Sequence, residues 1–226
     1  MKEKLRMTTR IMAAIAAATI ALAGAASPVA GATKPPAYVD MDDDGRYSAG
    51  DLRIDRIGSL RRLDRDRVLV GSVGSGDNRF TLVYVVNGHD LHVDGRIAGH
   101  NLAIVNRGGD IVIGPRATIA GTGPQFALAT RRGPTGDAIA GTLDIRESAR
   151  VAHTYSSARA RQVQIEAGDL RLGAGVDVSS LPARDGRTTA RADRAAEVAH
   201  VKVTGSIDRH PTATVRGLPV VLTKQP

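Results

Sequence analysis

The chain has 226 residues, a formal net charge of +8 at pH 7 and no cysteine. Its length fits one domain with a short appendage, and the lack of thiols excludes disulfide bonds, thiolate metal sites and cysteine-based catalysis. Aromatic residues make up only 3% of the chain and tryptophan is absent, which disfavours the flat stacking platforms of a carbohydrate-binding module.

Residues 1–32 have the three parts of a secretory signal. A basic start precedes an apolar, alanine-rich run from Ile11, and small residues end the segment at Ala32. We therefore predict cleavage after Ala32 and a secreted or cell-surface location. The alternative is a retained membrane anchor, but Gly24 and Pro28 interrupt the apolar run before it reaches the roughly 20 residues that span a bilayer. No second candidate transmembrane segment follows in the sequence.

The segment 40–51 has the ligand spacing of a calcium loop. Calcium takes six to eight oxygen ligands, and here side-chain oxygens stand at positions 1, 3, 5, 9 and 12, with Gly45 at position 6 for the sharp turn. The predicted Ca²⁺ ligands are Asp40, Asp42, Asp44, Arg46 through its carbonyl, Ser48 and Asp51. Because Asp51 is one methylene shorter than the usual glutamate, we expect an affinity of about 10⁻⁴ to 10⁻³ M. The alternative is an acidic, solvated linker.

This segment resembles an EF-hand and, more narrowly, the loop of dockerins, which also reads D-x-[DN]-x-D-G-x-x-[NS]-x-x-D followed by leucine, here Leu52. The resemblance implies calcium binding by the loop. Dockerins carry a pair of such loops, whereas this sequence has one, and Pro35 and Pro36 stand where an entering helix would run. The resemblance therefore implies ion binding rather than docking to a cohesin.

Apolar residues recur at mostly helical spacing between Leu52 and Leu63, with charged residues between them. This pattern predicts a short amphipathic helix, so that residues 33–70 would form a unit of calcium loop and helix. Glycines recur in residues 71–79, which we predict to be a flexible linker.

From residue 80 onward one sequence pattern recurs, in which two short strands of alternating hydrophobicity are joined by a corner of small residues. The copies begin at Asp90, Asp110, Thr142, Asp169 and Val201. Such a repeat predicts a mainly β fold, a small right-handed parallel β-helix (solenoid) over residues 80–208, followed by a C-terminal tail over residues 209–226. The side chains expected to stack inside are Leu91, Val93, Ile111, Ile113, Leu143, Ile145, Leu170 and Leu172. The alternative is a β-sandwich.

The paired strands and their corners look like the repeats of bactofilins and of filamentous-haemagglutinin-type proteins. Asp90, Asp110 and Asp169 hold the same place in three copies. In a β-helix such a row can bind a cation or act as acid and base, as in the pectate-lyase-like enzymes that resemble this fold; the alternative is that each aspartate forms a corner. His89 and His92 are close in sequence, but alternation along a strand separates them, so we predict no shared metal there.

An arginine-rich stretch over residues 184–194 predicts either a solvated loop or short helix, or a contact with an anionic glycan, a lipid or a nucleic acid. No nucleic-acid motif accompanies it, so we expect no nucleic-acid partner. The sequence as a whole predicts a secreted, calcium-binding, non-enzymatic structural or adhesive surface protein. Besides calcium, its candidate partners are an anionic glycan, a cell-wall polymer or another surface protein. The alternatives are a β-helical polysaccharide-acting enzyme and a cell-wall or lipid-binding module.

Overall fold

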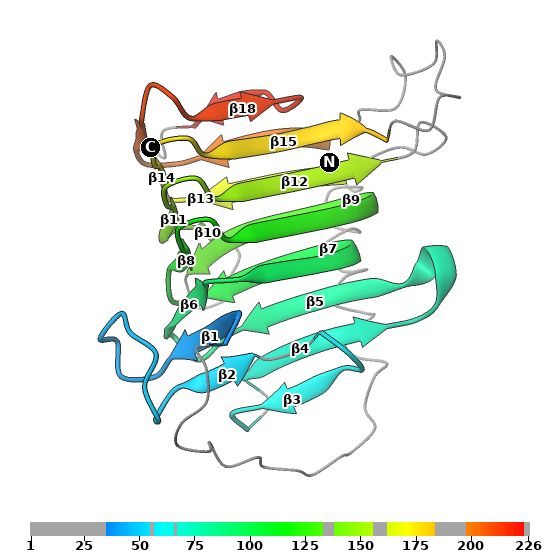
Figure 1. The fold of residues 1–226 in the computed structure, drawn as a ribbon, viewed down its shortest axis with the longest axis vertical. Coiled ribbons are helices and arrows are strands. Elements are labelled where there is room, and N and C mark those ends of the chain that lie inside the picture. Colours follow the sequence, from blue (N-terminus) through cyan, green and yellow to red (C-terminus); the bar gives the residue numbers. More distant parts are fainter. Residues whose placement is uncertain are drawn as a thin grey trace.

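A computed structural model describes residues 35–54, 57–65, 67–132, 138–155, 162–183 and 198–223. These residues fold mainly into β-strands, as the sequence predicts, and most strands lie side by side in long ladders (Figure 1). The predicted signal and the arginine-rich stretch lie outside the described residues. Among the described residues, no helix has the length and apolar character that a membrane crossing requires.

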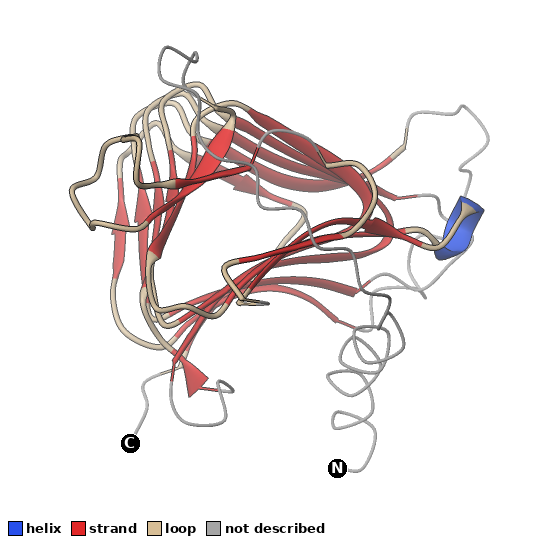
Figure 2. Ribbon diagram, turned by 90° about the horizontal axis from the view of Figure 1, so that it is seen from below, coloured by secondary structure: helices blue, strands red, loops and turns tan. Residues whose placement is uncertain are grey.

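Most strands belong to three stacks in which neighbours are parallel. The first stack contains β6 (Asp90–Val93), β8 (Ile111–Ile113), β11 (Thr142–Ile145), β14 (Asp169–Leu172) and β17 (Ile207–Arg209). The second contains the first halves of β7 (Arg96–Arg107) and β9 (Thr118–Arg132), then β12 (Arg150–Tyr155), β15 (Asp177–Pro182) and β18 (Thr214–Arg216). The third contains β5 (Phe80–Val85), the second halves of β7 and β9, then β13 (Gln162–Ala167), β16 (Val198–Val203) and β19 (Val220–Leu222). Figure 2 shows the strands on three sides of the molecule.

The register of the stacks places apolar residues in columns. In the first stack Leu91, Ile111, Leu143 and Leu170 are successive partners, and Val93, Ile113, Ile145 and Leu172 form the next column. All eight side chains are buried in one apolar core, as predicted. Burial of each such side chain contributes roughly 1.5–3 kcal/mol. We call one strand from each of the three stacks, taken in chain order, a layer. A single layer cannot cover its own apolar residues, so the burial of these side chains depends on the neighbouring layers.

The corner between the first and second stacks keeps a constant form. Four residues separate β8 from β9, β11 from β12, β14 from β15, and β17 from β18. The third corner residue has a positive φ in three layers, at Arg116 (61°), Ser148 (57°) and Gly175 (67°). The fourth corner residue is buried in every case: Ala117, Ala149, Val176 and Ala213. The small-residue corner inferred from the sequence is therefore a repeated turn that begins the next strand.

The N-terminal end of the stacks is covered by antiparallel strands. β1 (Ala37–Asp40) pairs with β6 on one side and with β2 (Leu52–Ile54) on the other. β4 (Val68–Val73) pairs with β5 and with β3 (Arg61–Leu63). Away from this end, a short β10 (Ala138–Ile139) pairs antiparallel with the last residues of β9. A 3₁₀ turn, η1 (Gly76–Asn78), lies between β4 and β5. The first described strand, β1, thus joins the same sheet as the repeats.

The predicted helix over residues 52–63 is wrong. The described part of this segment forms β2 and β3, which hydrogen-bond to β1 and β4. Ile54 is buried in the shared core and Leu63 packs against it. These two sheet edges give the segment partners for its backbone groups, and Gly58 between the strands disfavours a continuous helix. Tertiary pairing therefore overrides the helical spacing.

Two other boundaries also differ from the sequence-based interpretation. Residues 71–79 include the end of β4 and the turn before β5, and Gly71 is required for close approach: a Cβ there would lie 2.5 Å from the Ser59 carbonyl oxygen. The predicted tail contains β18 and β19, which form the last layer of the second and third stacks. The repeated strands therefore continue further toward the C-terminus than the sequence pattern, which ends at residue 208, predicts.

Candidate metal site in the loop between β1 and β2

The loop between β1 and β2 is held at its neck by strand pairing. Val39 pairs with Leu52, which brings the two ends of the loop together. Asp40 is the last residue of β1 and lies opposite Asp90 of β6, so the first predicted ligand is part of the sheet. The loop is therefore anchored to the first stack at Asp40.

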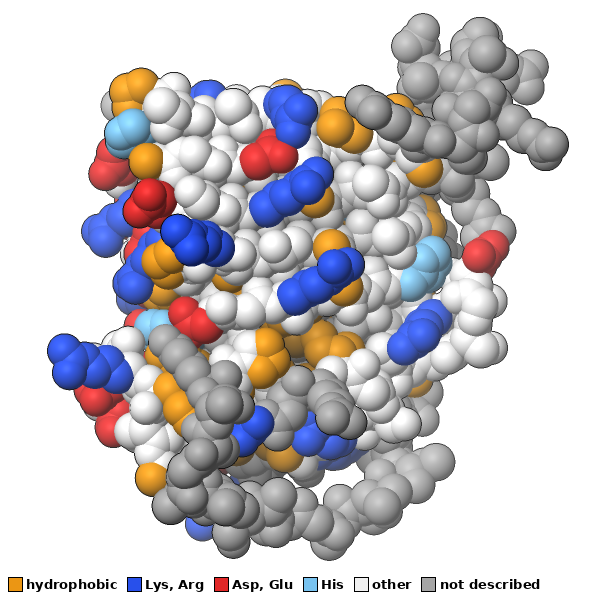
Figure 3. Space-filling view, viewed as in Figure 1, with side chains coloured by type: hydrophobic (Ala, Val, Ile, Leu, Met, Phe, Trp, Pro, Cys, Tyr) orange, Lys and Arg blue, Asp and Glu red, His pale blue; other side chains and the backbone are white. Residues whose placement is uncertain are grey.

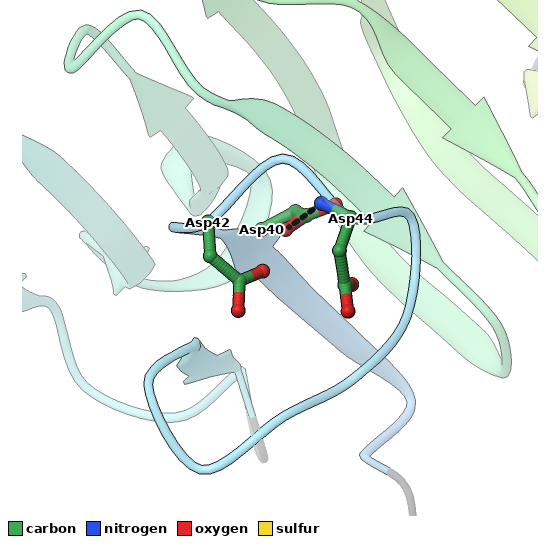
Figure 4. Close-up of side chains that lie close together, drawn as sticks. All are labelled: Asp40, Asp42 and Asp44. Atoms are coloured by element: carbon green, nitrogen blue, oxygen red, sulfur yellow. Dashed lines mark hydrogen bonds between the residues drawn. The ribbon is translucent and has the colours of Figure 1, made fainter.

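Three carboxylates converge inside this loop. Oxygens of Asp40, Asp42 and Asp44 all lie within 4.8 Å of one another. Asp40 is buried, whereas Asp42 and Asp44 are exposed and direct their carboxylates to the same side of the loop (Figure 4). Three carboxylate oxygens at this separation, open to solvent on one side, form a set of hard ligands suited to a divalent cation.

Asp40 also shapes the loop through its backbone contacts. Its Oδ2 accepts the N–H of Gly45 at 2.7 Å and its Oδ1 accepts the N–H of Asp44 at 3.3 Å. Gly45 has a φ of 73°, the left-handed conformation that the sharp turn requires. A carboxylate oxygen has more than one lone pair, so these bonds leave Asp40 able to ligate a cation.

The other predicted ligands, Arg46, Ser48 and Asp51, lie at different positions relative to the three converging carboxylates. The Ser48 hydroxyl lies 3.3 Å from Asp42 Oδ2, so it is beside the carboxylate group. Asp51 does not belong to the group of three; its buried carboxylate accepts the N–H of Met41 at 2.8 Å and of Ser48 at 2.6 Å. The Arg46 N–H donates to Asp44 Oδ1 at 2.6 Å. Asp51 therefore closes the neck of the loop, and Ser48 connects it to Asp42 through one hydrogen bond with each residue.

An aromatic pair supports the loop from the sheet. His92 of β6 stacks on Tyr38 of β1 with ring centroids 4.9 Å apart, and its Nε2 lies 3.6 Å from Asp40 Oδ2. Burial lowers the pKa of His92 despite the nearby carboxylates of Asp40 and Asp94. Burial, together with Asp94 and Asp40, raises the pKa of Tyr38. Sequence reasoning gave His92 no role, because the antiparallel pairing of β1 with β6 joins segments about fifty residues apart and leaves no local pattern.

The two neighbouring histidines approach different carboxylates. His89 Nδ1 lies 3.2 Å from Asp43 Oδ1, whereas His92 faces Asp40. Asp43 is in the same loop but is not one of the three converging carboxylates. Asp43 can therefore serve as a control for substitutions of the three converging carboxylates.

The aspartates of the repeat bond to the backbone of the following layer. Asp90 accepts the N–H of Asp110 at 2.7 Å, Asp110 accepts the N–H of Thr142 at 2.8 Å, and Asp169 accepts the N–H of Ser206 at 2.7 Å. The Ser206 hydroxyl also donates to Asp169, at 2.6 Å, and this bond together with that of the N–H lowers the pKa of Asp169. Each carboxylate thus satisfies a backbone donor at a corner. These contacts favour the corner interpretation over the acid and base interpretation.

A polar cluster that the sequence did not indicate lies on the outer side of the third stack. Glu166 of β13 is buried between Arg131 of β9 and His200 of β16, and pairs with both. Burial raises the pKa of Glu166, but the hydrogen bond with His200 and the charge of Arg131 outweigh this effect and lower it. Only the register of three separate strands brings these residues together, so no local signal marks them.

Basic side chains on the described surface are largely interspersed with acidic ones. Arg150 and Arg216 both pair with Asp177, and Arg146 pairs with Asp144. Figure 3 shows the basic side chains of this face as separate groups, several of them beside acidic residues. The described part of this face therefore lacks a continuous basic surface of the kind that a polyanion-binding module would use.

Comparison of the chain with known proteins identifies no related family, protein or structure. No family model, no curated protein and no solved structure matches the chain. The resemblance of residues 40–51 to a dockerin loop thus depends on the ligand spacing alone.

Proposed function

We propose that this chain is an exported, non-enzymatic structural or adhesive protein whose strand stacks form a right-handed parallel β-helix and whose loop 40–51 binds calcium. The observation that carries the calcium proposal is the convergence of Asp40, Asp42 and Asp44 within 4.8 Å, beside Ser48. The export proposal depends on the signal-like composition of residues 1–32. The parallel register of successive layers supports the β-helix proposal.

The proposed ion would act on the N-terminal end of the stacks. Three carboxylates held this close repel one another, and a divalent cation removes that repulsion while cross-linking the loop. Because Asp40 belongs to β1 and β1 pairs with β6, stabilisation of the loop would also hold β1 against the first stack. In this proposal calcium secures the N-terminal cap of the β-helix, and the repeated layers provide an extended surface.

Two observations favour a structural role over the polysaccharide-acting alternative. Asp90, Asp110 and Asp169 are engaged by backbone donors, and Thr142 interrupts their row. A catalytic acid and base need carboxylates that converge on a substrate bond. The one group of three such residues that converges in the described chain is in the β1–β2 loop.

Calorimetric titration with calcium tests the proposed site. We expect binding with a dissociation constant of about 10⁻⁴ to 10⁻³ M. The variant Asp42→Asn with Asp44→Asn should abolish the heat, because both carboxylates are exposed and can be neutralised without removing the backbone bonds of Asp40. The matched control is Asp43→Asn, which removes a charge from the same loop outside the converging group and should bind normally. Equal heats from the double variant and the unaltered protein would overturn the site.

A further inference from the structure

The last described strand of the third stack, β19, forms an apolar sheet edge. The described strands of three residues or more that end the sheets are β2, β3, β17, β18 and β19. Arginine occurs in each of the first four: Arg53 in β2, Arg61 and Arg62 in β3, Arg209 in β17 and Arg216 in β18. β19 reads Val-Val-Leu and carries no charge. Charged side chains on an edge strand oppose pairing with another chain, so β19 lacks the protection of the other edges.

The exposure of β19 differs from that of the strand it covers. Val220 and Leu222 pair with Val201 and Val203, which are 2% and 0% exposed, and so continue the columns of the core. Yet Val220, Val221 and Leu222 are 44%, 42% and 51% exposed. With Leu181 they are the large apolar side chains that the described part of the chain leaves exposed. Leu181 lies at the corner that leads into β19, because a Cβ on Gly217 would be 3.5 Å from its Cδ2.

The other two stacks end differently at the same end of the molecule. In β17 the column of Ile145 and Leu172 ends in Arg209, whose guanidinium donates to the Ala213 carbonyl oxygen at 2.7 and 3.1 Å. In β18 Arg216 donates to Asp177 at 2.7 Å. An inward-placed charge protects the first edge and a paired arginine the second. The contrast confines the apolar edge to the third stack.

We propose that two copies of this chain associate through the edges of their β19 strands, antiparallel about a two-fold axis at Val221. This arrangement places Val220 opposite Leu222 of the second copy and Val221 opposite its own equivalent, so every pair is apolar. The edge is thus complementary to itself. Head-to-tail growth would instead place β19 against β2 or β3, whose arginines oppose it, so the assembly closes as a dimer.

The short edge sets the strength of this association. Three paired residues and Leu181 make a contact smaller than a standard interface, so we expect a dissociation constant on the order of 100 µM. The proposal does not depend on calcium, because the β1–β2 loop adjoins the first stack at β6, whereas β19 pairs with β16 at the other end of the third stack. The dimer should therefore form equally with calcium and with chelator.

Sedimentation equilibrium over a wide concentration range tests the proposal on protein purified from cells that express the full chain. We expect an apparent mass that rises about twofold between dilute and concentrated samples. Val221→Lys should remove that rise, since it places like charges opposite each other at the axis. Thr214→Lys is the matched control: it adds the same charge to the β18 edge, beside Asp177, and should leave the rise unchanged. Thermal unfolding of both variants checks that they are folded.

A cysteine cross-link provides a second measurement, because the chain has no cysteine of its own. Val221→Cys should form a disulfide-linked dimer under mild oxidation, since directly opposed residues of antiparallel strands bring their Cβ atoms to about the separation of a disulfide. Thr214→Cys should cross-link at least tenfold more slowly, on the order expected for a residue in β18 that lies away from the proposed two-fold axis at Val221. A mass that stays monomeric at every concentration, a dimer that survives Val221→Lys, or equal cross-linking of the two cysteine variants would each overturn the proposal.

Discussion

The interior of the strand stacks and their polar margins are stabilised by different contacts. Inside, columns such as Leu91, Ile111, Leu143 and Leu170 repeat the same apolar contact from layer to layer. At the margins, single polar residues have individual partners: Asp51 closes the β1–β2 loop, and Asp110 bonds to the next corner. We therefore expect the repeated apolar contacts to contribute most of the stability, whereas the polar contacts at the margins differ from layer to layer.

We expect substitutions in the apolar interior to destabilise the fold most. Leu143→Ala removes a fully buried side chain from the middle of its column, so we expect a loss of about 2–5 kcal/mol in the free energy of unfolding. Urea unfolding followed by circular dichroism measures it. Arg171→Ala, at an exposed position of the adjacent strand, is the control and should change the free energy by less than about 0.5 kcal/mol. Similar losses from both variants would contradict a stability concentrated in the columns.

A smaller effect is expected at the buried cluster of the third stack. Glu166→Gln should cost about 1–3 kcal/mol at pH 7, because Arg131 and His200 lose their charged partner. The pKa of Glu166 is lowered by folding, so its contribution is complete above its ordinary value of 4.5 and is lost as the pH falls through the folded value. Unfolding measured between pH 7 and pH 3 should therefore show the variant and the unaltered protein converging in acid. A constant difference at every pH would show that the carboxylate charge does not contribute.

The smallest effect is expected at a corner. Asp110→Ala removes the acceptor of the Thr142 N–H and should cost about 1 kcal/mol. Asp144→Ala is the matched control, because its carboxylate faces Arg146 in a surface pair that stabilises little. Thermal unfolding of the two variants gives the comparison. If Asp144→Ala lowered the stability as much as Asp110→Ala, the corner hydrogen bond would stabilise the fold no more than a surface ion pair does.

The interior and the loop spacing could be predicted from the sequence, because both are local. The alternation of Leu91 with Val93, and its return at Ile111 with Ile113, identifies the buried side of each strand without knowledge of the partner strand. The spacing of Asp40, Asp42 and Asp44 likewise identified three carboxylates that do converge.

The features that could not be predicted depend on pairing between distant segments. The apolar residues from Leu52 to Leu63 fit a helix equally well, and only the free edges of β1 and β4 make them strands. Glu166 gives no sign in the sequence that Arg131 and His200 are its neighbours, since each comes from a different layer. The role of Asp51 as a clamp on the loop neck, rather than one of the converging carboxylates, depends on the contacts with Met41 and Ser48.

The corners of the stacks differ in how much chain they accept. The corner between the first and second stacks keeps four residues from β8 onward. Between the second and third stacks, β7 and β9 pass through the corner without a break, whereas β12 ends at Tyr155 and β13 begins at Gln162, and β15 ends at Pro182 and β16 begins at Val198. The strands that follow keep their register on β9 and β13 despite these different lengths. This corner is therefore the natural place to graft a foreign peptide or a reporter domain, and successive layers would display such insertions in a row along one edge.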